Sequence, residues 1–425
     1  MRVLIYVHGH PRIQPGGSEV AAYSLFQEMK ARGYDAFFLG VAENAFSDGR
    51  PALCQFTDDG TEHVMPRLVS DHFLQLGDQR TDILDDVVRL VRDRSIDLIH
   101  FHHVLGLGTD GLIYLRRRLP DVAFVFTAHE FLSICARHGQ MLMSDLAGRC
   151  MRPEPEKCAR CLKPELPGLR HHLPAYFALR ESLFRQAFAG LDAVISPSRF
   201  LAERLMEAEI CPSDIKVIEN LNAHSAEFSP DAGSPSEKVN RFGFFGQMNP
   251  FKGADVLLEA ARLLASDSGG PNPEIHLFGM LAGDNLSYPY FISQQLSAGN
   301  GVTYHGAYDG RRVVSLMRDM DWIVVPSVWW ENSPVVIEEA LIAGRPVICS
   351  NIGGMAEKVV DGLFGLHFEV GNAQELASKM RLACGNAGLW RKLVARRRRP
   401  AGAEEVASAH LGVYEAAMSA RRAAH

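Results

Sequence analysis

The sequence has few cysteines, no long apolar run and no excess of basic residues. Eight cysteines in 425 residues are too few for a disulfide scaffold. No uninterrupted apolar run approaches the roughly 20 residues that a membrane-spanning helix needs, and the apolar start from Met1 to His8 is too short for a secretory signal. The net charge of −6 gives no basis for binding nucleic acid. We therefore expect a cytoplasmic protein without a nucleic-acid partner.

The length and composition indicate two packed domains. A chain of 425 residues exceeds one ordinary core, and 47% apolar with 22% charged residues is normal for a globular protein. A short basic run, Arg396 to Arg399, could touch anionic lipid, although such runs are more often solvated helix faces. Peripheral membrane contact therefore stays open. Four isolated cysteines are expected to be small buried hydrophobes: Cys54, Cys211, Cys349 and Cys384.

Short β-branched and aromatic runs alternate with longer helical stretches along the whole chain. This alternation is typical of parallel strands joined by crossover helices, and runs that are apolar on both faces fit central parallel strands. The sequence therefore predicts the α/β class. The expected strands are 3–7, 36–39, 98–101, 123–127, 193–196, 241–245, 274–278, 322–326 and 346–350, and the expected helices include 19–32, 82–94, 254–264 and 335–343.

A stretch of turn-forming residues from Ser229 to Lys238 divides the chain, and a new strand is expected to begin at Arg241. We predict an N-terminal domain over residues 1–228 and a C-terminal domain over 241–400. A last helix over 401–425 is expected to pack back toward the N-terminal domain. Ligands bind at the carboxyl ends of the strands in open α/β sheets, so two such domains facing a central cleft would place a donor and an acceptor together.

The segment from Pro326 to Ala340 carries the most information about function. A strand is expected to end near Pro326, and a helix to begin near Pro334, which suits a first helical position. The backbone N–H groups of Val335 and Val336 would then be exposed and would favour a phosphate.

Two glutamates in this segment suit a sugar nucleotide. Glu339 would lie about one turn into the helix, where its carboxylate can accept hydrogen bonds from a ribose diol. Glu331, in the preceding loop, can reach the hydroxyls of a sugar. The alternative is that Glu331, Glu338 and Glu339 only complement the dipole of the helix N-terminus.

Glycine-containing loops follow the first expected strand of each domain. Gly246 ends a strand in the second half, and Lys252 directly precedes a helix, where its charge can neutralise a diphosphate. In the first half Gly16 and Gly17 open the first helix, which lets backbone approach a ligand closely. An ordinary tight turn explains a lone glycine pair equally well.

Four further cysteines cluster in a segment rich in proline and basic residues: Cys135, Cys150, Cys158 and Cys161. Fourteen, seven and two residues separate them, and the last spacing is that of a metal knuckle. Four thiolates could hold a structural zinc ion and order an insertion over about 131–168. Free thiols, or a redox pair at Cys158 and Cys161, are the alternatives.

In their order along nearly the whole chain these motifs resemble glycosyltransferase family 4. That family has the GT-B architecture of two Rossmann-like domains and transfers sugar with retention of anomeric configuration. The resemblance implies transfer from a UDP- or GDP-linked sugar to a glycan or lipid-linked acceptor, most often in surface or extracellular polysaccharide biosynthesis. It rests on Gly16-Gly17, Thr127-Ala-His129-Glu130, Ser196-Pro-Ser-Arg199, Gly246 with Lys252-Gly253, Glu331 through Glu339-Ala340, and Gly353-Gly354 with Glu357.

The resemblance also implies roles for individual residues. Glu339 would bind the nucleotide ribose, Glu331 would orient the donor sugar, and Lys252 would hold the diphosphate. His129 would contact the transferred sugar, unless it is a structural histidine. No metal or other cofactor is then required for catalysis, because Lys252 and backbone amides would stabilise the leaving group. The rest of the donor site would comprise Asn332, Ser333, Pro334, Val335 and Val336.

One position departs from the family pattern. The family often has Arg after the glycine at Gly246, whereas this chain has Gln247, and a neutral amide cannot supply that charge. Three explanations are open: Lys252 and the helix dipoles alone neutralise the diphosphate, Arg199 supplies the missing positive charge, or the activity is reduced. Gln247 favours one alternative, a zinc-organised sugar-binding scaffold without activity. A nucleotide-sugar epimerase and a phosphorylase are also kept as alternatives, because both use related two-domain architectures.

Overall fold

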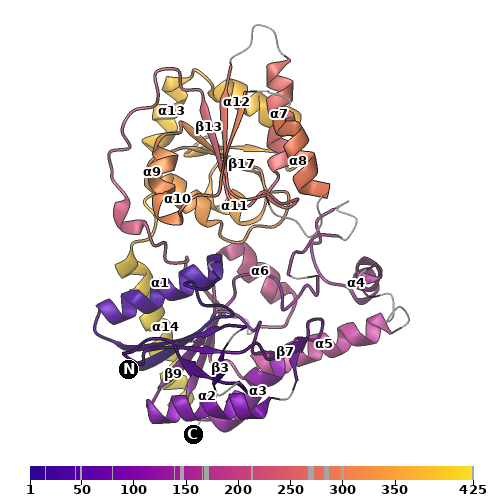
Figure 1. Ribbon diagram of the computed structural model, residues 1–425, viewed down its shortest axis with the longest axis vertical. Helices are drawn as coiled ribbons and strands as arrows, with labels where there is room; N and C mark the ends of the chain where they lie inside the picture. Colours follow the sequence, from indigo (N-terminus) through magenta and orange to yellow (C-terminus); the bar gives the residue numbers. More distant parts are fainter. Residues whose placement is uncertain are drawn as a thin grey trace. The chain divides into compact units, whose positions relative to one another are not determined.

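The computed structural model of the chain (Figure 1) contains two compact units, which are described separately. The first comprises Met1–Ala223 together with Ala403–His425, and the second comprises His224–Gly402. The division falls before His224, slightly earlier than the expected domain end at residue 228. The predicted positions 138, 144–147, 165 and 167–168 of the insertion and 424–425 of the last helix lie outside the described residues. The structure describes residues 1–14, 16–43, 45–47, 50–78, 80–137, 139–143, 148–164, 166, 172–211, 214–266, 272–281, 287–297 and 301–423.

The first unit is built on an eight-stranded sheet in the order β12-β11-β10-β9-β1-β2-β6-β5. Neighbouring strands are parallel, except that β5 runs antiparallel to β6. β3 (Phe46–Ser47) pairs with β4 (Arg50–Pro51), and β7 (Val69–Asp71) pairs with β8 (Leu76–Gly77), each antiparallel. The strands of the main sheet are β1 (Arg2–Tyr6), β2 (Asp35–Val41), β5 (Cys54–Gln55), β6 (Glu62–Met65), β9 (Leu98–Phe101), β10 (Ala123–Thr127), β11 (Ala193–Ser196) and β12 (Ile215–Val217).

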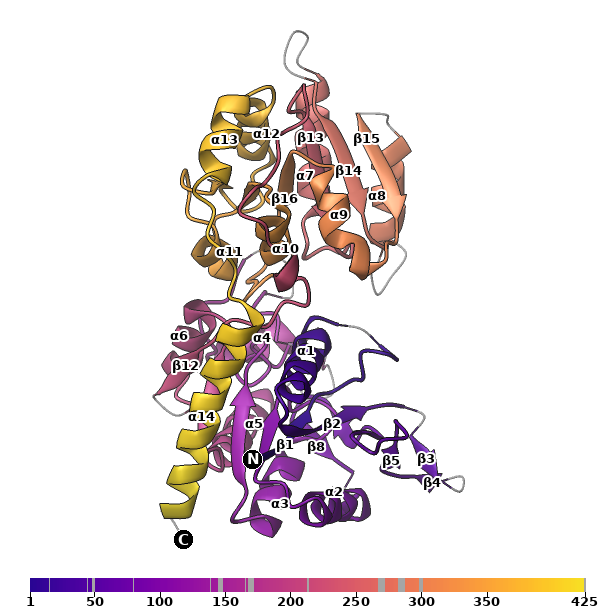
Figure 2. The same ribbon diagram turned by 90° about the vertical axis from the view of Figure 1, so that its left-hand side faces the viewer.

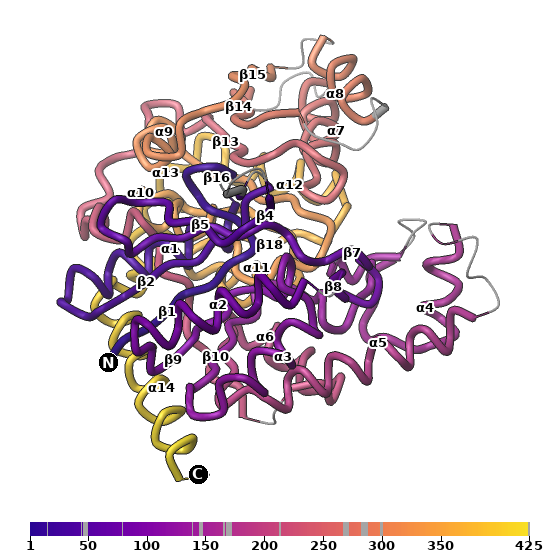
Figure 3. The backbone as a smooth tube through the Cα atoms, turned by 60° about the horizontal axis from the view of Figure 1, so that its bottom comes forward, coloured from indigo at the N-terminus to yellow at the C-terminus, as the bar shows by residue number. Residues whose placement is uncertain are grey.

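Helices connect and cover these strands. The last helix, α14, returns to this unit from the far end of the chain and runs along it (Figure 2). It packs on β10 and α1, and Tyr414 and Ala417 join the core around Val3 and Ile5. α4 packs on α5 at the edge of the unit (Figure 3). The helices are α1 (Gly17–Ala31), α2 (Thr81–Asp93), α3 (Thr109–Arg118), α4 (Pro155–Leu162), α5 (Leu173–Phe188), α6 (Arg199–Glu207) and α14 (Ala403–Ala423).

The second unit is a six-stranded parallel sheet in the order β15-β14-β13-β16-β17-β18. The order reverses between β13 and β16, which defines a topological switch point of the Rossmann type. The strands are β13 (Arg241–Phe245), β14 (Glu274–Phe278), β15 (Val302–Gly306), β16 (Trp322–Val325), β17 (Val347–Ser350) and β18 (Gly365–Phe368). The helices are α7 (Ala254–Ala265), α8 (Ser287–Ser297), α9 (Val313–Arg318), α10 (Val335–Ala343), α11 (Gly353–Lys358), α12 (Ala373–Ala383) and α13 (Ala387–Val394), with short 3-10 turns η2 (Ser225–Glu227) and η3 (Gly310–Arg312).

The predicted α/β class is confirmed, and several elements match the prediction residue for residue. The strands at 98–101, 123–127, 193–196, 241–245 and 274–278 are β9, β10, β11, β13 and β14, and the helix at 335–343 is α10. Each is an apolar run bounded by turn formers. The edge strands β5, β12, β15 and β18 and the inner strand β6 were not predicted, because their residues are less uniformly apolar and β15 is largely exposed.

Two expectations about the surface are wrong. The basic run does not form a helix face, because α13 ends at Val394 and the following arginines serve the second unit. Arg397 donates to the carbonyls of Ser229 and Pro230, and Arg398 Nη2 lies 2.6 Å from Glu338 Oε1. Among the isolated cysteines Cys349 is buried, but Cys54, Cys211 and Cys384 are only half-buried. Within the described residues no helix is both long and apolar enough to span a membrane.

Candidate functional site

The loops that leave β13 and β16 meet at the switch point of the second unit. The backbone N–H of Val328 donates to the carbonyl of Phe251 at 2.9 Å. Gly253 ends the β13 loop with φ +69, and a Cβ atom there would lie 2.0 Å from the carbonyl oxygen of Pro326. Only glycine permits this backbone conformation and this approach without strain. The glycine thus brings Lys252 to the segment that carries Glu331.

Glu331 lies at the centre of a set of hydrogen-bond donors. Its Oε1 atom is 2.6 Å from Lys252 Nζ, 2.9 Å from Ser327 Oγ and 2.9 Å from Trp329 Nε1. The residue is only 7% exposed, and burial alone would raise its pKa. The charge and hydrogen bond of Lys252, with the other donors, lower the pKa of Glu331 below its ordinary value instead. A fixed, ionised carboxylate therefore stands beside a lysine at the carboxyl end of β16.

The Gly353-Gly354 motif supports the same loop from α11. The N–H of Gly354 donates to the carbonyl of Glu331 at 2.7 Å. A Cβ atom on Gly354 would lie 1.8 Å from the carbonyl oxygen of Asn332, so this contact also requires glycine. The backbone around Glu331 is therefore held on both sides, by the β13 loop and by the start of α11.

Helix α10 presents an N-terminus without a side-chain cap. It begins at Val335, and Pro334 is its N-cap residue with φ −63 and ψ 115. The expected helix start near Pro334 is confirmed, and Pro334 itself is the N-cap rather than the first helical residue because its ψ is still extended. No side chain caps the helix, and the first N–H groups of a helix have no partner within it. These donors and the helix dipole make a suitable place for a phosphate.

The two glutamates of α10 differ in their environment. Glu338 is buried and pairs with Lys358 and with Arg398, so it holds the unit together. The alternative expected these glutamates only to complement the helix dipole, and the structure gives Glu338 two ion pairs that this alternative did not include. Glu339 is half-buried; burial raises its pKa to about 7, and His224 opposes the rise only partly. A buried carboxyl group with a strongly raised pKa is typical of a binding site.

The remaining predicted donor-site positions in the second unit are Gly246, Gln247, Asn332 and Ser333. Gly246 has φ +137 and donates its N–H to the carbonyl of Phe278 at 3.0 Å. Gln247 is exposed, whereas Asn332 and Ser333 are half-buried.

Asp319-Met320-Asp321 matches the Asp-x-Asp pattern of metal-dependent sugar transferases, but its second carboxylate serves the fold. It accepts hydrogen bonds from Ser236 and from the N–H of Arg241.

In the first unit His129 follows the carboxyl end of β10 and meets a second histidine. Its Nε2 atom lies 2.9 Å from His102 Nδ1, and the two rings stack with centroids 5.1 Å apart. Burial and the neighbouring histidines lower the pKa of His129 to about 3. The imidazole is therefore neutral at physiological pH, so it can take part in hydrogen bonds but does not supply a positive charge.

A buried chain of polar groups continues from His102 to the C-terminal helix. The His102 ring lies 4.2 Å from the ring of His100. His100 Nε2 is 2.7 Å from Thr127 Oγ1, and its Nδ1 is 2.7 Å from Tyr414 Oη on α14. The C-terminal helix thus supports the histidine that orients His129. Sequence reasoning did not identify His102 or His100, although both lie at the end of β9, next to β10.

A second set of titratable groups surrounds the start of α1. His8 Nε2 lies 3.0 Å from Glu19 Oε1, and His103 Nε2 lies 3.2 Å from Glu130 Oε1. The rings of the two histidines are 4.3 Å apart. Burial raises the pKa of Glu130 to about 7; burial acts in the same direction on Glu19, but the interaction with His8 brings that pKa to about 2. The sequence did not indicate His8 or His103, and it gave Glu130 only as part of the Thr127-Ala-His129-Glu130 motif, without an assigned role.

The remaining predicted donor ligands belong to the first unit. Gly16 is the N-cap of α1 and Gly17 its first residue, and no side chain caps this helix either. Arg199 is the first residue of α6, behind the capping Ser198. The structure therefore places Lys252, Glu331 and Glu339 in one unit, and His129, Gly16, Gly17 and Arg199 in the other. The roles of all these residues as ligands remain predictions.

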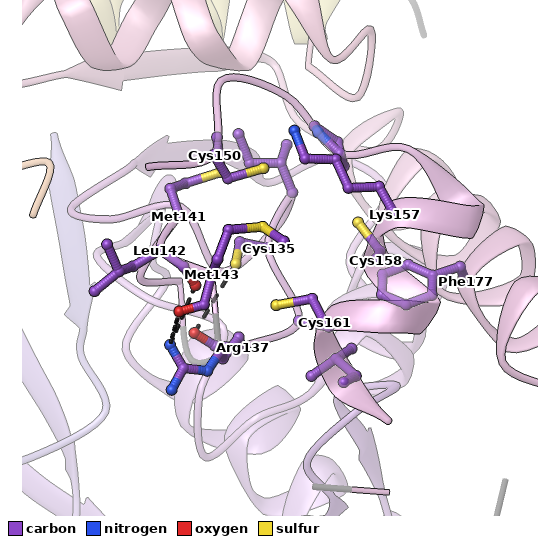
Figure 4. Close-up of a pocket in the computed structure, with 14 residues that line it drawn as sticks. Cys135, Arg137, Met141, Leu142, Met143, Cys150, Lys157, Cys158, Cys161 and Phe177 are labelled. Atoms are coloured by element: carbon purple, nitrogen blue, oxygen red, sulfur yellow. Dashed lines mark hydrogen bonds between the residues drawn. The ribbon is translucent and has the colours of Figure 1, made fainter. Parts of the chain in front are cut away.

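The four clustered cysteines line a single pocket of the first unit (Figure 4). They come from the turn after His129, from the segment before α4, and from α4 itself. Among the residues that the structure describes, no group of three or more His, Cys, Asp or Glu side chains is already placed to hold a metal ion. The predicted zinc site therefore remains a proposal.

Comparison with known proteins agrees with this architecture. The profile described as "Glycosyl transferases group 1" matches residues 226–399, and that described as "Glycosyltransferase Family 4" matches residues 15–221. A D-inositol 3-phosphate glycosyltransferase of Corynebacterium aurimucosum is 22% identical over 89% of this chain and 87% of its own. The enzyme of that name from Nocardia farcinica is 26% identical over 85% of this chain and 77% of its own.

Solved structures show the same fold. HepE of Anabaena in complex with UDP has a TM-score of 0.63 at 19% identity and covers 100% of this chain and 99% of its own. Sucrose-phosphate synthase of Thermosynechococcus elongatus has a TM-score of 0.69 at 16% identity, over 99% and 100% of the two chains. With two parallel-sheet units, each matched by a transferase profile, the chain belongs to the group 1, family 4 glycosyltransferases of GT-B fold and is a glycosyltransferase.

Proposed function

We propose that the protein is a retaining glycosyltransferase that moves a sugar from a nucleotide diphosphate donor to a glycan or lipid-linked acceptor. The observation that carries the donor assignment is the arrangement in the second unit. Lys252 Nζ lies 2.6 Å from Glu331 Oε1, and the same loop leads into the uncapped N-terminus of α10. Both features lie where a Rossmann-type sheet binds its ligand.

In this proposal each group has a separate task. Lys252 and the N–H groups of Val335 and Val336 bind the diphosphate and stabilise the charge that develops on it as the sugar leaves. All three hydrogen bonds described for the Glu331 carboxylate go to Oε1, so Oε2 is assigned to a hydroxyl of the sugar. Glu339 accepts from the ribose hydroxyls. The donor phosphate takes the acceptor proton, so no protein base is assigned.

His129 is assigned to a hydroxyl of the transferred sugar. A neutral imidazole can donate one hydrogen bond and accept another, and the contact with His102 orients the ring. Because the pKa of His129 is held near 3, this interaction stays constant across the physiological pH range.

The choice of donor and acceptor is supported by the proteins that this chain resembles. Structures of HepE of Anabaena contain UDP or UDP-glucose, which favours a UDP-sugar here over a GDP-sugar. Several relatives are named D-inositol 3-phosphate glycosyltransferases, so a phosphorylated cyclitol is a second candidate acceptor. A role in surface or extracellular polysaccharide synthesis accords with a glycan acceptor.

Calorimetric titration with a panel of UDP- and GDP-sugars tests the donor assignment. Saturable binding of one donor is expected for the wild type, and Glu339→Ala should weaken it at least tenfold, the loss of about 1.4 kcal/mol expected for hydrogen bonds to a charged group. Glu259→Ala, a surface glutamate of the same unit that pairs with Arg262, is the matched control. Equal binding by wild type and Glu339→Ala would refute the site.

The alternatives make different predictions in the same experiment. A scaffold without activity, which the neutral Gln247 would favour, binds donor but does not consume it when acceptors are supplied. An epimerase changes the donor sugar without any acceptor. Product analysis by mass spectrometry separates these outcomes, since only transfer joins the sugar to a second molecule.

A further inference from the structure

Four cysteines from three separate segments meet at one pocket of the first unit. Cys135, Cys150, Cys158 and Cys161 all line it (Figure 4), and the sulfurs of Cys135 and Cys150 donate to the nearby carbonyls of Arg137 and Arg152. The other lining residues are largely apolar, including Met141, Leu142, Leu162 and Phe177. Half of the eight cysteines of the chain therefore line one pocket.

Local backbone hydrogen bonds place each of these cysteines. The N–H of Cys135 donates to the carbonyl of Phe131, and the N–H of Cys150 to that of Met141, both at 2.7 Å. Cys158 and Cys161 lie three residues apart on α4 and so share one helix face. The backbone thus fixes the positions from which the cysteine side chains reach the pocket.

The pocket is surrounded by positive charge. Arg137 and Lys157 contribute to its lining. Arg180 is only 2% exposed, and its Nη2 donates to the carbonyl of Leu132. Its guanidinium carbon lies 4.5 Å from the ring centre of Phe184. Its Nη1 has no hydrogen-bond partner among the described residues. Cys135 and Cys158 are among the groups that interact with its charge. A buried cation without a firm anionic partner is costly.

Besides the two cysteines, the acidic groups that interact with the charge of Arg180 include Glu130 and Asp71. A centre carrying two negative charges at the four thiols would match the cations Arg137, Lys157 and Arg180.

We propose that Cys135, Cys150, Cys158 and Cys161 bind one structural zinc ion as four thiolates. Zinc with four thiolates carries a net charge of about −2, which Arg180, Lys157 and Arg137 offset. Since no three of the side chains are already placed around an ion, the thiols turn toward a shared centre and lose their protons on binding. Tetrahedral sulfur sites hold zinc or an iron–sulfur cluster, and a single ion is the smaller group.

The zinc ion has a defined structural consequence. It joins α4 to the turn that directly follows His129 and Glu130. Leu132 lies in that turn: its N–H donates to Glu130, and its carbonyl accepts from Arg180. Metal binding therefore stabilises the segment beside His129 without any ligand being shared with the proposed donor site. The zinc proposal does not depend on the proposed function.

Metal analysis of the full chain, purified after expression with zinc supplied, tests the proposal. About one zinc per chain is expected in the wild type, and Cys158→Ser with Cys161→Ser should retain less than about a tenth of that. The matched control is Cys54→Ser with Cys211→Ser, which leaves the pocket unchanged and should keep its zinc. Both control cysteines are half-buried and lie outside the pocket.

A second measurement on the wild type keeps the proposal testable if the double variant fails to fold. A strong chelator should lower the melting temperature by several degrees, and added Zn²⁺ should restore it. Replacement by Co²⁺ should give the absorption of tetrahedral thiolate coordination. Zinc below about a tenth per chain, iron in its place, a disulfide between these cysteines, or a melting temperature indifferent to the chelator would each overturn the proposal.

Discussion

The carboxyl group of Glu339 gives a sharp test of the donor site, because function and stability should respond to it in opposite directions. Burial raises its pKa from an ordinary 4.5 to about 7. Between these values the folded state holds a proton that the unfolded state has released, so stability falls as the pH rises and stays lower above pH 7. At 1.36 kcal/mol per pKa unit the penalty is about 3 kcal/mol, an upper limit for a half-buried group.

Glu339→Gln removes this penalty while keeping the shape of the side chain. We expect the variant to be more stable than the wild type by up to about 3 kcal/mol at pH 8, and nearly equal to it at pH 4.5. The same variant should lose donor affinity, because an amide cannot accept two hydrogen bonds with the strength of a carboxylate. Urea denaturation at the two pH values measures the first effect and calorimetry the second.

The pH dependence of donor binding follows from the same group. If the ionised carboxylate binds the ribose, the wild type should bind about tenfold more weakly at pH 6 than at pH 8, since about a tenth of a group with pKa near 7 is ionised at pH 6. Glu339→Gln should bind equally at both. A stability difference that does not change between pH 4.5 and pH 8, or a wild-type affinity independent of pH, would refute the reasoning. Glu259→Gln is the control for both measurements.

Three further predictions concern the loops and the histidines. Lys252→Ala should weaken donor binding by more than tenfold and raise the pKa of the buried Glu331. Calorimetry at several pH values measures both effects, with Arg262→Ala as the control. An unchanged affinity would exclude the diphosphate contact. Gly253→Ala should destabilise the second unit by about 2 kcal/mol or more, because the new methyl group would meet the Pro326 carbonyl. Gly371→Ala has a similar φ but no neighbour within 4 Å, so equal losses in thermal melting would show that the contact does not matter. His102→Ala should lower kcat roughly tenfold with little change in KM, and His102→Asn should recover part of it; a change in KM alone would contradict a positioning role.

Much of the fold was predictable because it depends on local sequence. Strands β9, β10, β11, β13 and β14 are short apolar runs between turn formers, and α10 follows Pro334 at the position where proline favours a helix start. Glycines at the ends of strands correctly indicated where loops begin, because glycine readily adopts the backbone conformations that tight loops need. The prediction failed at the edge strands and at β6, where pairing with a neighbour rather than apolar character decides the structure.

The sequence by itself determined the class of the fold, the order of its elements and the candidate residues Lys252, Glu331, Glu339 and His129. Only the tertiary structure decided how these side chains are used. It paired Glu338 with Lys358 and left Glu339 with a raised pKa, though the two residues are adjacent. It also brought Tyr414 beneath His100, from the opposite end of the chain. The physical reason is that burial and charge neighbours depend on contacts between distant segments, which the local sequence pattern does not encode.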